Sequence, residues 1–204
     1  MIDMWWQAHL TFALFVFLIT PGFGANPGWQ GLRLLVLLAI SFIPVDGLSL
    51  AAYVRSFTGD TAITTLVLLG YLVAVRAGLA EPLRRQATVQ IMLVMAALAV
   101  FLYPATMGLS ALDPYRLGYQ PRPLIVLIAV LAFALLALKN RLGAALFALA
   151  TLAFSVGLKP SPNYWDYLID PFIGLYSCGA VIGYAIKGLW RRKTTTQDAL
   201  SIQP

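Results

Sequence analysis

The stretch at residues 87–107 reads ATVQIMLVMAALAVFLYPATM and contains no charged side chain. About 20 helical residues, at roughly 1.5 Å each, cross the roughly 30 Å hydrocarbon core of a bilayer. This stretch therefore has the length and polarity of a membrane-crossing helix. Similar apolar stretches lie on both sides of it. Together they predict seven membrane spans, at residues 5–22, 32–54, 60–79, 87–107, 123–138, 142–158 and 167–190.

The composition of the whole chain is typical of an integral membrane protein. Hydrophobic residues make up 60% of the 204 residues and charged residues 11%, and the mean hydropathy is +0.82. An ordinary soluble domain has roughly 25% charged residues, and a soluble fold of this size could not bury so much apolar surface. We therefore expect an all-α fold, a polytopic helical bundle with residues 1–190 as a single transmembrane domain.

The two ends of the chain have different characters. No Lys or Arg precedes the apolar run from Leu10 to Ile19, so we interpret that run as a retained first span and not as a cleavable signal peptide. Residues 191–204 are polar, and we expect them to form a disordered cytoplasmic tail. The tail begins with three basic residues, which an anionic inner leaflet would attract.

Two arrangements fit the second span. Residues 32–45 are too short to cross a bilayer, but continuing the span past Pro44 places Asp46 in the apolar zone. Either one helix kinks at Pro44 and carries Asp46 in the outer leaflet, or a short span ends there and residues 48–57 lie along the membrane interface. A carboxylate inside the bilayer needs a partner or a water-filled cavity, so the first arrangement makes Asp46, with Arg55, a candidate functional site.

The basic residues predict the orientation of the chain. With a cytoplasmic C-terminus, ten Lys and Arg residues lie inside and four lie outside. Because Lys and Arg in loops resist translocation, this distribution favours an N-terminus outside and a C-terminus inside, in the plasma membrane or in the inner membrane of a Gram-negative bacterium. Six spans remain if the first run only lies on the surface. The ten are Arg33, Arg76, Arg84, Arg85, Lys139, Arg141, Lys187, Arg191, Arg192 and Lys193; the four are Arg55, Arg116, Arg122 and Lys159.

Few side chains are suited to holding a metal or a cofactor. Cys178 is the single cysteine and His9 the single histidine, which excludes an intramolecular disulfide, bis-His haem and the usual zinc sites. The net charge of +6 is scattered among loops and forms no basic domain for nucleic acid. We expect no cofactor, no metal site and no nucleic-acid partner, and we expect the lipid bilayer as the main partner.

Polar and aromatic residues gather in two loops on the predicted outer side. Residues 112–123 read LDPYRLGYQPRP and residues 163–172 read NYWDYLIDPF, each with Asp-Pro and an aromatic residue where a helix begins. One interpretation is mechanical, since Asp caps a helix, Pro suits its first position and the aromatic ring lies in the interface. The other is an outward-facing pocket for a polar headgroup, sugar or cation. Its candidate residues are Asp46, Arg55, Asp113, Tyr115, Arg116, Tyr119, Asn163, Trp165, Asp166 and Asp170.

The last span carries glycines that predict close helix packing. Gly179 and Gly183 form a small-xxx-small pattern, and Gly174 precedes them. Small residues let helices approach closely in a membrane, so we expect this face to pack against a helix of the same chain or of another membrane protein. Cys178 lies within this span, and we expect no catalytic role for its thiol.

Three functions of different classes fit these features. The leading hypothesis is a non-enzymatic accessory or scaffold subunit of a membrane or envelope lipid or glycan pathway, because the loops are short and charges within the spans are few. The second is a small transporter that uses Asp46 and the outer acids. The third is a membrane enzyme acting on lipid or lipid-linked substrates at the outer face, with Arg116 or Arg122 holding phosphate. No spacing among these residues identifies a catalytic group.

Overall fold

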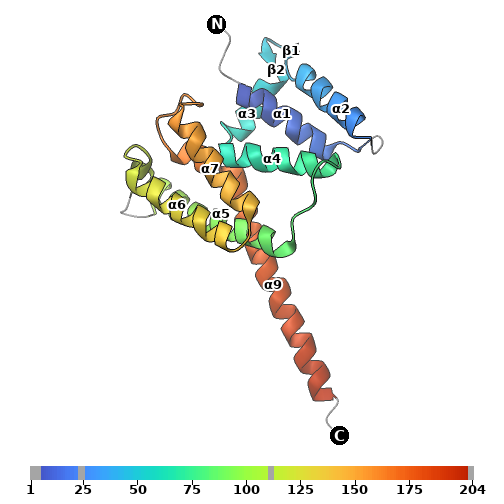
Figure 1. The fold of residues 1–204 in the computed structure, drawn as a ribbon, viewed down its shortest axis with the longest axis vertical. Coiled ribbons are helices and arrows are strands. Elements are labelled where there is room, and N and C mark those ends of the chain that lie inside the picture. The colour runs from blue at the N-terminus through green and yellow to red at the C-terminus, as the bar shows by residue number, and fades with distance from the viewer. Residues whose placement is uncertain (1–5, 23–25, 110–112, 202–204) are drawn as a thin grey trace.

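The structure is a computed structural model that describes residues 6–22, 26–109 and 113–201 (Figure 1). Within these ranges the fold is all-α, as expected, apart from one 3-10 helix and one short hairpin. The helices are α1 (Trp6–Ile19), α2 (Pro27–Ile40), α3 (Leu50–Thr58), α4 (Ile63–Arg76), α5 (Arg85–Thr106), α6 (Arg122–Ala137), α7 (Arg141–Ser155), α8 (Trp165–Leu168) and α9 (Pro171–Ser201). The hairpin consists of β1 (Pro44–Val45) and β2 (Leu48–Ser49), and the 3-10 helix η1 covers Pro114–Gly118.

Each predicted span overlaps one of the longer helices, namely α1, α2, α4, α5, α6, α7 and α9. Among the described residues, α5 alone is long and apolar enough to cross a membrane by length and composition. Five other apolar helices have 14 to 16 residues, or about 21–24 Å at 1.5 Å per residue. The all-α prediction is confirmed, and the seven crossings stay a prediction.

The second predicted span is not one continuous helix. Helix α2 ends at Ile40, and the antiparallel hairpin β1–β2 follows, with Asp46 and Gly47 at positive φ in its turn. The Ser49 side chain then accepts a hydrogen bond from the Ala52 amide and begins α3 as a separate helix. The kinked-helix arrangement is therefore wrong, because the chain reverses direction before α3 begins.

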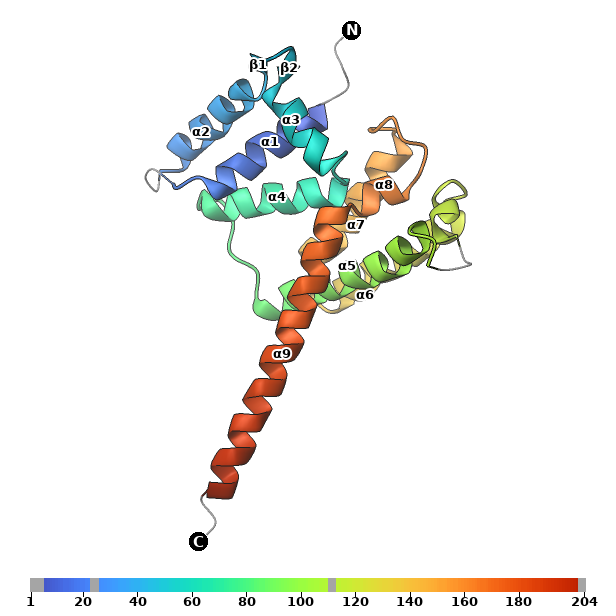
Figure 2. The same ribbon diagram turned by 180° about the vertical axis from the view of Figure 1, so that it is seen from behind.

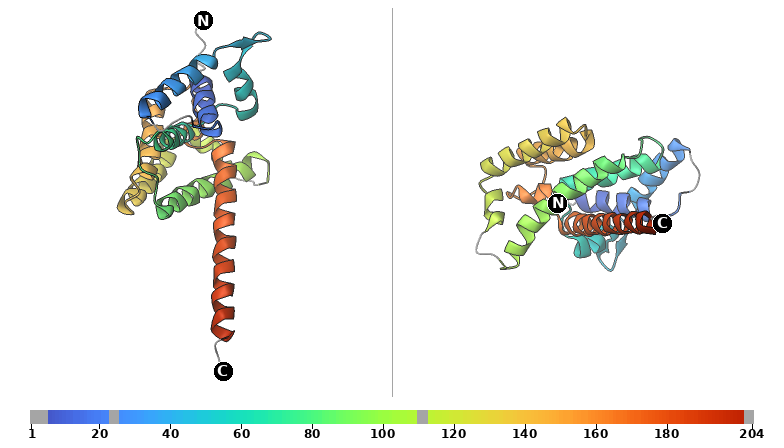
Figure 3. Two further views of the ribbon diagram at one scale, coloured as in Figure 1. Left: turned by 90° about the vertical axis from the view of Figure 1, so that its right-hand side faces the viewer. Right: turned by 90° about the horizontal axis from the view of Figure 1, so that it is seen from below.

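The helices pack in pairs around a shared core. Helix α5 packs against α9, α6 packs against α7, and α1 lies against α2, α3 and α4 (Figures 1 and 2). The core includes the fully buried side chains of Phe17, Met95, Phe147 and Trp165. Helix α9 begins inside this assembly and then extends well beyond it (Figure 3). Residues 191–201, where we expected a disordered tail, continue this helix.

Charged side chains form two groups, and we call the first of them the basic end. Arg33 of α2 and Arg76 of α4 both donate to the Thr20 carbonyl after α1, at 3.0 and 2.8 Å. Arg85, at the start of α5, places its guanidinium carbon 5.7 Å from the ring centroid of Tyr184 in α9. In the basic end, α2 and α4 thus bond to the end of α1, and Arg85 at the start of α5 contacts α9.

We call the opposite group the pocket end. There the backbone amide of Ala62, just before α4, donates to the Asp170 carboxylate before α9, at 2.8 Å. The Asn163 side chain, between α7 and α8, donates to the Tyr115 carbonyl in η1 at 3.1 Å. Since η1 lies between α5 and α6, the pocket end joins segments from four different connections of the chain.

Candidate functional site

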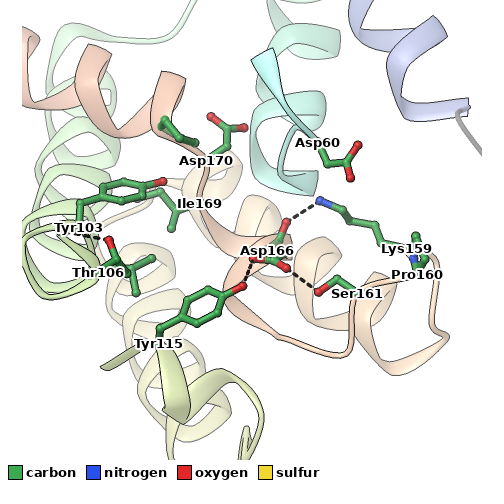
Figure 4. Close-up of a pocket in the computed structure, with 12 residues that line it drawn as sticks. Asp60, Tyr103, Thr106, Tyr115, Lys159, Pro160, Ser161, Asp166, Ile169 and Asp170 are labelled. Atoms are coloured by element: carbon green, nitrogen blue, oxygen red, sulfur yellow. Dashed lines mark hydrogen bonds between the residues drawn. The ribbon is translucent and has the colours of Figure 1, made fainter. Parts of the chain in front are cut away.

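A pocket of about 290 Å³ lies at the pocket end, where α5 ends and α9 begins (Figure 4). Polar side chains from five separate parts of the chain line it. They come from the connection before α4, the end of α5, η1, the α7–α8 region and the residue before α9. These side chains are Asp60, Tyr103, Thr106, Tyr115, Lys159, Ser161, Asp166 and Asp170.

Asp170 connects the first turns of two helices. Its Oδ1 accepts a hydrogen bond from the Ile173 amide of α9 at 2.9 Å. Its Oδ2 accepts the hydrogen bond from the Ala62 amide at 2.8 Å. A carboxylate satisfies free amides at a helix N-terminus and is stabilised by the helix dipole. Asp113 makes the corresponding bond to the Arg116 amide of η1 at 3.2 Å. Both Asp-Pro elements therefore have the capping role that the mechanical interpretation predicts.

Asp166 links η1 to the α7–α8 loop. Its Oδ1 accepts a hydrogen bond from the Tyr115 hydroxyl at 3.1 Å, and its Oδ2 accepts one from the Ser161 hydroxyl at 2.5 Å. Burial and the Asp166 charge raise the pKa of Tyr115. The phenol therefore stays protonated and acts as a donor to the carboxylate.

Lys159 places a buried ammonium group beside these acids. Its side chain is buried, and Nζ donates to the carbonyls of Thr61 at 2.9 Å and Asp166 at 2.7 Å. Burial lowers the pKa of Lys159, while the charges of Asp166, Asp60 and Asp170 act in the opposite direction. An ammonium group has three N–H donors, and among the described residues the third has no hydrogen-bond acceptor, while the Tyr167 ring centroid lies 5.6 Å from Nζ.

Asp60 lies at the edge of the pocket and forms a two-point ion pair with Arg55. The Arg55 Nε and Nη2 donate to its two carboxylate oxygens at 2.6 and 3.1 Å. These bonds hold the pKa of Asp60 below its ordinary value. Asp46, which we grouped with Arg55 from the sequence, instead lies exposed in the hairpin turn.

Three of the ten predicted site residues, Tyr115, Asp166 and Asp170, line this pocket. Two more, Asn163 and Trp165, are fully buried and brace the loops that carry it. The Asn163 Oδ1 accepts the Trp165 amide at 2.9 Å, and the indole N–H of Trp165 donates to the Pro114 carbonyl at 2.8 Å. Their role in the structure is therefore to hold the α7–α8 loop against η1.

The other predicted residues lie outside the pocket lining. Arg116 is exposed in η1, and Asp113 caps that helix. Tyr119 is exposed and contacts Tyr115 edge to face, with ring centroids 5.8 Å apart. Arg55 reaches the pocket only through its ion pair with Asp60.

The predicted glycine face divides into two parts. Gly174 packs tightly against α5, because a Cβ there would lie 2.9 Å from the Tyr103 ring and 3.2 Å from the Ala99 Cβ. Gly179 and Gly183 have no atom within 4 Å of such a Cβ among the described residues. The small-xxx-small pair is thus not used for packing within the described chain.

Sequence reasoning missed Asp60, Tyr103, Thr106, Lys159 and Ser161 as pocket residues. One signal was present for Lys159, which is one of four basic residues on the predicted outer side and stands against the general charge distribution. The others carry no pattern of their own, and only the fold brings them together. Within the described residues, no group of three or more His, Cys, Asp or Glu side chains is arranged to hold a metal ion.

The arrangement supplies fixed carboxylates, one ammonium group and phenol rings around a small space. Such a set can bind a polar or charged ligand and orient it. Comparison with protein-family models, with curated proteins and with solved structures finds no match to this chain.

Proposed function

We propose that this chain is a multi-pass membrane protein that crosses the bilayer seven times, with its N-terminus outside and its C-terminus in the cytoplasm. We further propose that it serves as a non-catalytic accessory subunit that presents the pocket at the outer face of the plasma membrane. The crossing segments are α1, α2, α4, α5, α6, α7 and the first part of α9. The pocket end then faces outward and the basic end faces the cytoplasm.

The separation of basic and acidic side chains into these two groups supports this topology. Arg33, Arg76 and Arg85 lie at the basic end, and Asp60, Asp166 and Asp170 lie at the pocket end. Large apolar side chains along α6 also point away from the protein, as expected for contact with lipid: Val126, Val130 and Phe133 are 63%, 59% and 71% exposed. The shorter helices require local bilayer thinning or flanking residues that snorkel, each at modest cost.

One observation carries the non-catalytic assignment, namely that the pocket's charged groups are held by the protein itself. Asp170 accepts two backbone amides, Asp166 accepts two hydroxyls, and Lys159 donates to two carbonyls. Such bonds fix the groups as the wall of a binding site, and their remaining lone pairs are suited to holding a ligand in place. Asp46, the centre of the transporter hypothesis, lies at an exposed turn.

The proposal is tested on the full chain in its native membrane. We expect the protein to stay in the membrane fraction after alkaline carbonate washing. In mild detergent we expect it to migrate above the mass of the 22.2 kDa monomer and the bound detergent. Release by carbonate would contradict the membrane assignment. A stable monomer that turns over envelope lipids by itself would contradict the accessory role.

A further inference from the structure

Counted over the described residues, the pocket keeps more free hydrogen-bond acceptors than donors. Each oxygen of Asp166 and Asp170 accepts one hydrogen bond, although a carboxylate offers about four lone-pair sites. The free donors are fewer: the third N–H of Lys159 and the hydroxyl of Tyr103, which has no hydrogen-bond partner among the described residues. A ligand that completes these groups must mainly donate hydrogen bonds and must also offer an acceptor oxygen with lone pairs for these two donors.

The charges around the pocket favour a cation. Asp60, Asp166 and Asp170 carry three negative charges, and Lys159 and Arg55 carry two positive charges, which leaves one net negative charge. Lys159 is only 4% exposed, so water does little to screen this part of the site. A ligand with a single positive charge would neutralise the group.

The walls and the size of the pocket favour an organic cation. The phenol rings of Tyr103 and Tyr115 belong to the lining, and aromatic faces attract ammonium groups (Figure 4). A volume of about 290 Å³ is at the lower limit of small-molecule sites. The site therefore suits a small molecule or a single headgroup.

We propose that this pocket binds a primary ammonium group carried next to an oxygen acceptor, as in an amino alcohol. The ammonium group donates to the free lone pairs of the carboxylates, and the oxygen accepts hydrogen bonds from the third N–H of Lys159 and from the Tyr103 hydroxyl. Free ethanolamine and the headgroup of phosphatidylethanolamine share this chemistry. The inference rests on the proposed function, in which the pocket faces the outer leaflet.

The test uses the full chain in nanodiscs of phosphatidylcholine, titrated with ethanolamine and, separately, with choline. Choline has the same charge but no N–H donor, so we expect saturable binding of ethanolamine at least tenfold tighter than that of choline. A second series replaces the nanodisc lipid by phosphatidylethanolamine. If the headgroup is the natural ligand, this lipid competes with free ethanolamine; if the ligand is a free amine, the lipid leaves ethanolamine binding unchanged.

Variants connect the binding to the pocket. Asp166→Asn keeps the size of the side chain but removes its charge, and we expect it to weaken ethanolamine binding at least tenfold. Tyr103→Phe removes an unpartnered hydroxyl without breaking a bond of the fold, and we expect a loss of a few fold. Asp113→Asn, an acid at the same end but outside the lining, is the matched control and should bind like the parent.

The proposal is overturned if neither ethanolamine nor phosphatidylethanolamine binds saturably, or if choline binds as well as ethanolamine. It is also overturned by a combination of two results. Asp113→Asn would weaken binding as much as Asp166→Asn does, and Tyr103→Phe would leave binding unchanged. Carbonate washing and the mass of the protein in detergent test the proposed function without any ligand. A protein that passes those tests and binds no amine refutes this inference alone.

Discussion

The pocket end and the basic end of the helices differ in how they use charged side chains. At the basic end, Arg33 and Arg76 both donate to the carbonyl that follows α1, and a helix C-terminus favours such cations. At the pocket end, Asp170, Asp166 and Lys159 bond to connections that are far apart in the sequence. Both ends therefore join segments that are distant in the sequence. The basic end gathers cations around the C-terminus of one helix, whereas the pocket end brings several connections together and encloses a site.

The comparison predicts that the pocket end is the more sensitive to substitution. Trp165→Ala should have the largest effect, because it removes a fully buried indole and leaves the Pro114 carbonyl without its donor. We expect a loss of about 3–5 kcal/mol in the free energy of unfolding, measured in detergent micelles. Trp29→Ala in α2, where the side chain is 52% exposed, is the matched control and should change stability by less than about 0.5 kcal/mol. Equal effects would contradict the difference between the two regions.

Asp170→Ala should have the next largest effect. It leaves the amides of Ala62 and Ile173 without acceptors in a buried place, which costs about 1–3 kcal/mol for each unsatisfied group. Thermal unfolding checks this loss. Asp113→Ala removes one exposed cap bond and should cost about 1 kcal/mol or less. If Asp113→Ala were the more damaging, the bridging role of Asp170 would be wrong.

Lys159 should make the stability of the protein depend on pH in the alkaline range. Its pKa in the folded protein is lowered by burial, so the unfolded chain binds the proton more tightly. Stability therefore rises as pH increases from the folded-state pKa toward the unfolded value near 10.4. Tyr115, whose pKa is raised, acts in the opposite direction near pH 10. We expect Lys159→Met to lack this rise when its free energy of unfolding is measured against pH beside that of the parent protein. Identical pH profiles would refute the assignment of the rise to Lys159.

Arg55→Gln should have the smallest effect, because the ion pair with Asp60 is partly exposed. Such pairs contribute up to about 1 kcal/mol. Since Arg55 lowers the pKa of Asp60, the contribution is present above the unfolded value near 3.9 and is lost as pH falls through the folded-state pKa. Unfolding curves of the two proteins should therefore converge at low pH. A difference that persists in full below that pKa would show that Arg55 acts by packing.

The sequence predicts the helices better than it predicts the site. Apolar runs between Gly, Pro and charged residues identify the helical segments, because the polarity of neighbouring residues in the sequence decides where these helices lie. The end of α2 could not be located, since Ile40 and Pro44 lie in equally apolar surroundings and the hairpin turn at Asp46 depends on local geometry.

The pocket depends on contacts between distant parts of the chain. Ala62 and Asp170 are 108 positions apart, and Tyr115 and Asp166 are 51 apart. The Asp-Pro motifs predicted two of these connections, because a helix cap can be recognised from a few neighbouring residues. Asp60 and Tyr103 have no local signal, since they become pocket residues only when α4, α5 and α9 pack.

The most direct test of the central claim is the accessibility of the two ends in living cells. In a Cys178→Ala background, Gln120→Cys places a thiol beside η1 at the pocket end. Leu138→Cys places one in the α6–α7 turn, where the Asn140 side chain donates to the Ala87 carbonyl in the first turn of α5, at the basic end. Both positions are exposed, and both substitutions keep every charge. A membrane-impermeant maleimide should label Gln120→Cys in intact cells and Leu138→Cys only after permeabilisation. Labelling of both thiols in intact cells, or the reverse pattern, would contradict a bundle whose pocket end faces outward.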